Sequence, residues 1–128
     1  MNKVKKITLH TDSAHGWLAV KRSLLIQLDI LTTISVFSYQ SKTGDTVYLE
    51  YHSDSTQFVE ACKKAKIEYE IIKAKTKERS PIRNYPHFQL TKTDLMKSIA
   101  HKKNIPLKDI KLSYVDMDEL IGIPEYEK

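Results

Sequence analysis

ISVFSYQSKTGDTVYLEYH, which spans residues 34–52, is the stretch that decides the fold prediction. Residues 34–40 and 46–52 are rich in β-branched and aromatic side chains, as strands commonly are. Between them, SKTGD has the composition of a turn, and Gly44 can adopt a positive φ without steric cost. The sequence therefore predicts a β-hairpin near the middle of the chain.

Further strands and helices are predicted on both sides of this hairpin. Alternation around Ile7 and Leu9 predicts a strand over residues 4–10, and a similar alternation predicts a strand from residue 67 to about residue 74. Apolar residues at three- and four-residue spacing predict helices over residues 21–29 and 54–66, with Trp17 anchoring the entry to the first. Asp54 is expected to cap the second of these helices.

The C-terminal part is predicted to add a third helix. Thr91 and Asp94 have the spacing of a capping box, and Asn104 and Pro106 would end the helix. Residues 110–114 suggest a short strand, and residues 116–121 a helical turn. Residues 75–88 hold two prolines and, with His87 counted, five basic side chains, which predicts an exposed connection.

This order of elements predicts a single small α+β domain, with a largely antiparallel sheet, helices on one face and a C-terminal helical extension. Residues 1–88 would form the core, and residues 89–128 the extension packed on or next to it. A chain of 128 residues buries about two thirds of its unfolded surface, so the core needs neither a metal nor a disulfide.

Composition excludes several classes of protein. The one cysteine, Cys62, allows neither an internal disulfide nor a Cys-rich zinc site, and it falls on the apolar face of a predicted helix. Three glycines are too few for a dinucleotide fingerprint or a P-loop, and no serine lies in Gly-x-Ser-x-Gly. We therefore predict no cofactor. The apolar run before His10 is too short for a signal peptide or membrane span, which favours the cytoplasm.

Charge is distributed unevenly along the chain. Residues 61–111 hold fourteen basic and five acidic side chains, whereas residues 112–128 hold one and five. The basic surplus would attract nucleic-acid phosphates or an acidic protein surface, or it is simply solvated. The candidate residues for binding a partner or phosphate are Lys73, Lys75, Lys77, Arg79, Arg83, Tyr85, His87, Lys97, Lys102 and Lys103. The candidate phosphate-mimicking acidic residues are Asp116, Asp118, Glu119, Glu125 and Glu127.

Several histidines and carboxylates form a candidate site for chemistry. If Ile7 and Leu9 face the core, the two-residue period of a strand directs polar neighbours to the opposite face, and the same holds for the hairpin. Should the two strands be neighbours, the converging residues are His10, Asp12, His15, Glu50 and His52. Imidazoles and a carboxylate would bind zinc, manganese or iron, or act as general acid and base. Polar residues are equally expected on any exposed strand face.

Part of the chain carries a family resemblance. The motifs are HTDSAHGWLAV at residues 10–20, SYQ at 38–40, VYLE at 47–50, Asp54, and IRNY at 82–85. With these, residues 7–88 resemble small uncharacterised proteins of bacteriophages, prophages and plasmids, which open with a similar His-Thr-Asp and His-Gly-Trp sequence. The resemblance implies a mobile-element accessory protein acting inside a bacterium, and it implies no particular activity.

These observations lead to three functional hypotheses. The first is a non-enzymatic binding protein that acts on a host protein or nucleoprotein complex, for example as an anti-CRISPR-like, counter-defence inhibitor. In that hypothesis the basic segment meets an acidic protein surface while the acidic tail mimics phosphate. The second is a small metal-dependent enzyme acting on nucleic acid or a nucleotide. The third is nucleic-acid binding through residues 73–103.

Overall fold

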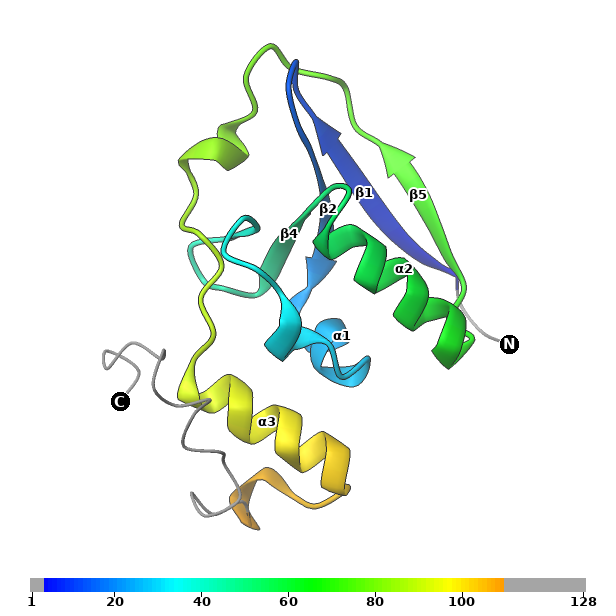
Figure 1. Cartoon of the computed structure of the whole chain (residues 1–128), viewed down its shortest axis with the longest axis vertical. Coiled ribbons are helices and arrows are strands. Elements are labelled where there is room, and N and C mark those ends of the chain that lie inside the picture. Colours follow the sequence, from blue (N-terminus) through cyan, green and yellow to red (C-terminus); the bar gives the residue numbers. More distant parts are fainter. Residues whose placement is uncertain (1–3, 110–128) are drawn as a thin grey trace.

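The chain folds around one five-stranded sheet. The structure is a computed structural model that describes residues 4–109, and Figure 1 shows its arrangement. The strands are β1 (Lys5–Thr11), β2 (Gly16–Lys21), β3 (Tyr39–Gln40), β4 (Thr46–Glu50) and β5 (Tyr69–Lys73). They are ordered β3-β4-β2-β1-β5, with β1 and β5 parallel and all other neighbours antiparallel. The predicted α+β fold with a largely antiparallel sheet is confirmed.

Two helices cover one face of this sheet, which we call the inner face. They are α1 (Arg22–Gln27) and α2 (Asp54–Ala65), and both begin within one residue of the predicted position. Leu18 and Leu49 are cross-strand partners, and both are buried in one core cluster with Leu25 and Phe58 from the helices. Cys62 lies in the same core, and burial raises the pKa of its thiol. Within residues 4–109, no helix is long and apolar enough to cross a bilayer.

The central strand β2 differs from the prediction. Trp17 and Val20 were assigned to the entry of a helix, but they lie in the strand between β1 and β4. Trp17, Leu18 and Val20 are all buried, because a central strand is covered on both faces. A strand that is buried on both faces does not alternate between apolar and polar residues. Its sequence therefore lacks the two-residue period that would distinguish it from a buried helix.

The hairpin is confirmed, but its first strand is shorter than predicted. Of the predicted first strand, only β3 pairs with β4, whereas residues 34–38 follow the 3-10 turn Leu31–Thr33 and lie outside the sheet. Asp54 explains the departure: its Oδ2 accepts hydrogen bonds from the Ser35 amide at 3.0 Å, from Ser35 Oγ at 2.7 Å and from Ser38 Oγ at 2.5 Å. The same bonds correct the predicted role of Asp54. Ser53 is the N-cap residue, and the buried Asp54 carboxylate holds the loop instead.

Residues 74–88 run back across the other face of the sheet, and we call them the outer-face segment. Residues 75–79 are exposed as predicted, but the rest is partly buried, because Ser80, Ile82 and Phe88 pack into the molecule. A 3-10 turn, Pro81–Asn84, lies in its middle. Its end lies beside β3, where the Phe88 amide donates to the Ser38 carbonyl at 2.8 Å and His87 forms a bridge with Tyr39.

The extension begins with the predicted helix, α3 (Lys92–Lys103). Its capping box is present: the Asp94 amide donates to Thr91 Oγ1 at 3.1 Å, and the Thr91 amide donates to Asp94 Oδ2 at 2.9 Å. The helix ends at Asn104, which adopts the left-handed conformation with φ 56°. A last 3-10 turn spans Leu107–Asp109. The predicted strand at 110–114 and turn at 116–121 lie outside the described residues.

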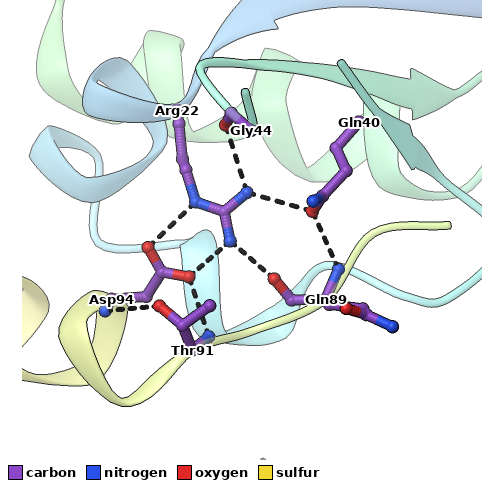
Figure 2. Close-up of polar contacts among 6 residues, drawn as sticks. All are labelled: Arg22, Gln40, Gly44, Gln89, Thr91 and Asp94. Carbon is purple, nitrogen blue, oxygen red and sulfur yellow. Dashed lines mark hydrogen bonds and ion pairs between the residues drawn. The ribbon is translucent and has the colours of Figure 1, made fainter. Parts of the chain in front are cut away.

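A network centred on Arg22 fastens α3 to the core (Figure 2). Arg22 Nε donates to Asp94 Oδ1 at 2.9 Å, and Nη2 pairs with the other carboxylate oxygen. Nη1 donates to Gln40 Oε1 at 3.2 Å and to the Gly44 carbonyl at 3.3 Å, while Nη2 also donates to the Gln89 carbonyl at 2.6 Å. One guanidinium therefore joins α1, the hairpin and the start of the extension, so residues 89–109 pack on the core.

Candidate interaction surface on the outer face of the sheet

The sheet register defines the face that lies opposite α1 and α2, which we call the outer face. His10 of β1 is the cross-strand partner of Trp17 of β2, and Trp17 in turn is the partner of Glu50 of β4. Because directly paired residues project to the same side, these three side chains form one row across the sheet. The predicted outward direction of His10 and Glu50 is confirmed by this register.

The five residues of the candidate metal site do not all come together. Strand β2 separates β1 from β4, so His10 and Glu50 are not neighbours as the prediction required. Asp12, His15, Glu50 and His52 line one cleft of about 340 Å³ at the end of the sheet. His10 lines a different pocket. Within residues 4–109, no three histidine, cysteine or acidic side chains form a group that could hold a metal ion.

Asp12 is instead a fixed part of the scaffold. Its carboxylate accepts from Arg83 Nε at 2.5 Å and Nη2 at 3.0 Å, and from the Ser80 amide at 3.1 Å. It also accepts from the amides of Ala14 and His15, both at 2.9 Å, which closes the turn between β1 and β2. These bonds, led by Arg83, hold the pKa of Asp12 well below its usual range. The pair fastens the outer-face segment to the sheet.

An aromatic cleft lies next to this ion pair. Its volume is about 370 Å³, and its lining residues are His15, Trp17, Phe37, Tyr39, Glu50, Arg83 and His87. The Tyr39 and His87 rings are stacked with centroids 4.6 Å apart, and the Trp17 and Tyr39 rings form an edge-to-face pair with centroids 6.1 Å apart. The guanidinium carbon of Arg83 lies 5.6 Å from the Trp17 ring centroid. Rings from three separate parts of the chain thus form one connected wall.

The rim of the aromatic cleft is apolar and exposed. Phe37 is 69% exposed and Val36 is 66% exposed, whereas Trp17 at the base of the cleft is 2% exposed. His87 Nδ1 donates to the Val36 carbonyl at 2.8 Å, which fixes the loop that carries both rim residues. An isolated exposed apolar side chain needs no explanation, but two adjacent ones beside a concave aromatic wall form a surface suited to a partner.

Apart from Arg83, which pairs with Asp12, the lysine and arginine candidates fall into two groups. Lys73, Lys75, Lys77 and Arg79 lie on β5 and the loop that follows it, and all four are exposed. Lys97, Lys102 and Lys103 belong to α3, which lies at the other end of the molecule from that loop in Figure 1. Lys102 pairs with Asp29 at 3.7 Å on the surface. The positive surplus of the sequence is therefore not one continuous surface. The acidic candidates at 116–127 lie outside the described residues.

Sequence reasoning missed Trp17, Phe37 and Tyr39 as parts of a site. Trp17 was interpreted as a core anchor, and Phe37 and Tyr39 were placed in an ordinary strand. The alternation of the hairpin could have indicated only that Tyr39 points outward. The wall forms because residues 86–88 return beside β3, a long-range contact that no local pattern indicates. Comparisons with protein-family models, curated proteins and solved structures give no match.

Proposed function

We propose that this protein is a non-enzymatic binding protein that occupies a surface of a host macromolecular complex, with the aromatic cleft as its contact. The observation that carries the proposal is the exposed pair Val36 and Phe37 on the rim of a wall built from Trp17, Tyr39 and His87. Tryptophan, tyrosine and arginine dominate the energetics of protein interfaces, and they do so from concave, well-packed positions.

The cleft is also held in shape before any partner arrives. Arg83 is fixed by two hydrogen bonds to Asp12, and His87 is fixed by its stacking on Tyr39 and its bond to the Val36 carbonyl. A preorganised surface binds more tightly because less side-chain and loop entropy is lost on association. This rigidity favours recognition of a folded host surface over chemistry that needs a mobile site.

Charge in the cleft indicates what the partner presents. The Arg83 guanidinium is compensated by Asp12, so the carboxylate of Glu50 is the uncompensated charge among the lining residues, with Ser53 Oγ donating to it at 2.6 Å. An apolar side chain next to a lysine, an arginine or another hydrogen-bond donor would therefore complement the cleft.

The resemblance of residues 7–88 to proteins of phages and plasmids supports a mobile-element origin for this binding function. A mobile element benefits when one of its proteins blocks a host defence complex. We therefore propose that the binding function is counter-defence inhibition of the anti-CRISPR type. The acidic residues at 116–127 would then act as a second contact, facing a basic nucleic-acid channel of the host complex.

The first test is capture of the partner by the tagged protein from nuclease-treated bacterial lysate. The Phe37→Ala variant should weaken the affinity for the captured protein by about 30-fold, because truncating a central aromatic contact costs about 2 kcal/mol. Titration of the isolated partner against both proteins measures the difference.

Leu107→Ala is the matched control, since Leu107 is also exposed but follows α3, away from the cleft. It should bind as the unaltered protein does. The absence of a stoichiometric partner, or equal loss of affinity in both variants, would contradict the aromatic cleft as the contact.

A further inference from the structure

A second pocket on the outer face shares no lining residue with the aromatic cleft. Its volume is about 250 Å³, just below the roughly 300–1,000 Å³ of typical small-molecule pockets, so it suits one compact group. β1 and β4 supply one wall, and the outer-face segment supplies the other. Its polar lining includes His10, Tyr48, Lys75, Lys77, Ser80 and Tyr85.

The charge of this pocket is positive without compensation. Lys75 and Lys77 line it, and neither forms an ion pair with any residue of 4–109. None of the lining residues is acidic, and the nearby Asp12 is already bound to Arg83. Burial lowers the pKa of His10, and the positive charge of Lys77, which lines the same pocket, lowers it further. A small concave site of one charge sign concentrates ions of the opposite sign.

The Ser80 hydroxyl gives this positively charged pocket a hydrogen-bond donor as well. Ser80 Oγ accepts from the Ile82 amide at 3.2 Å, which leaves the hydroxyl proton of Ser80 free to donate. Burial raises the pKa of Tyr48, and the charge of Tyr85 and a hydrogen bond to it raise that pKa further, so the Tyr48 phenol stays protonated. Lysines that supply charge, together with hydroxyl donors, are a common means of holding phosphate oxygens.

Aromatic rings stand beside the same charges. The Tyr48 and Tyr85 centroids are 5.3 Å apart, and the His10 and Tyr48 rings form an edge-to-face pair with centroids 6.0 Å apart. Both tyrosines are only partly buried, so part of each ring faces solvent at the pocket. Partly exposed tyrosines beside lysines are the combination by which proteins hold one nucleotide, because the ring stacks on the base while the ammonium groups bind the phosphate.

We propose that this pocket binds one nucleotide, free or within a single strand, with Lys75 and Lys77 on the phosphate and Tyr48 or Tyr85 against the base. Lys75, Lys77 and Tyr85, which the sequence analysis named as candidates for binding phosphate, line this pocket. His10, which it named as a candidate metal ligand, lines the same pocket. The nucleotide site is independent of the aromatic cleft and of the partner that the cleft would bind.

The test is a calorimetric titration of the purified full chain with thymidine 5′-monophosphate, thymidine and a short single-stranded oligodeoxythymidine. The monophosphate should bind more tightly than thymidine. The Lys75→Gln/Lys77→Gln double variant should bind the monophosphate at least about tenfold more weakly, because it removes both cationic contacts to the phosphate. If the oligonucleotide binds more tightly than the monophosphate, the natural ligand is a nucleotide within a single strand. If the two bind equally, the natural ligand is a free nucleotide.

Lys42→Gln/Lys92→Gln makes the same charge change outside the pocket and should leave the affinity unchanged. No binding of the monophosphate, or equal weakening in the two double variants, would overturn the nucleotide site. The two proposals fail separately, because Phe37→Ala should keep nucleotide binding and Lys75→Gln/Lys77→Gln should keep the captured partner.

Discussion

Three buried aspartates each hold a segment that is distant in sequence. Asp12 binds Arg83 of the outer-face segment, Asp54 binds the loop of Ser35 and Ser38, and Asp94 binds Arg22. Removing a carboxylate from water is costly unless charged or polar donors replace the lost hydration. Each of these carboxylates is therefore committed to its donors, which is why none of them serves as a free ligand.

The Arg22–Asp94 pair should make stability depend on pH in the acid range. Burial alone would raise the pKa of Asp94, but the Arg22 guanidinium and Thr91 hold it below its ordinary value. A carboxyl with a depressed folded pKa contributes stability above its unfolded pKa, about 3.9, and loses it as the pH falls through the folded pKa. Asp94→Asn should lower the free energy of unfolding by about 3 kcal/mol at pH 7 and by progressively less below about pH 4, as urea titrations would show.

Asp29→Asn is a suitable control for that variant. Asp29 pairs with Lys102 at 3.7 Å, but both side chains are largely exposed, and such pairs contribute about 0–1 kcal/mol. Its stability at pH 7 should match that of the unaltered protein within this range. If Asp94→Asn were no less stable than Asp29→Asn, the network in Figure 2 would not be what fastens α3.

Among the elements, the outer-face segment is held over Trp17 by the Asp12–Arg83 ion pair together with the backbone bonds beside β3. Arg83→Ala should release the 3-10 turn Pro81–Asn84 and expose the indole, because the Asp12 carboxylate then has no cation to bind. Trp17 is the single tryptophan of the chain, so its fluorescence reports on this position alone. A red-shifted emission and faster acrylamide quenching are expected, with the far-ultraviolet circular dichroism unchanged.

Arg79→Ala removes an exposed arginine from the same segment and should leave the Trp17 emission as it was. Equal spectra for Arg83→Ala and the unaltered protein would mean that Phe88, Ile82 and the pairing beside β3 hold the segment without the ion pair.

At the scale of the whole molecule, local patterns predicted the elements better than their contacts. The turn at Gly44 and the capping box of Thr91 are encoded within a few residues, and both are present. The central strand β2 was missed because its apolar run has no polar period. The assumed pairing that would have brought His10 beside Glu50 was wrong because that same strand lies between them. The aromatic cleft was not predictable because it needs the return of residues 86–88 to β3.

The acidic C-terminal residues give a prediction for the complete chain. If they contact a basic channel of the host complex, replacing Asp116, Asp118, Glu119, Glu125 and Glu127 by neutral amides should weaken binding to the captured partner, most strongly at low salt. Titrations at two salt concentrations measure this. If the affinity is unchanged at both salt concentrations, residues 4–109 recognise the partner without the acidic side chains.

The parallel pairing of β1 with β5 also determines the order in which the sheet can be completed. Lys5 pairs with Tyr69, so β1 leaves the ribosome long before its partner strand has been synthesised. Until then one edge of β1 presents unpaired backbone groups, a feature that invites association between nascent chains. The antiparallel β1–β2 and β3–β4 hairpins have close partners and can form early, whereas closure of the long loop to β5 comes last.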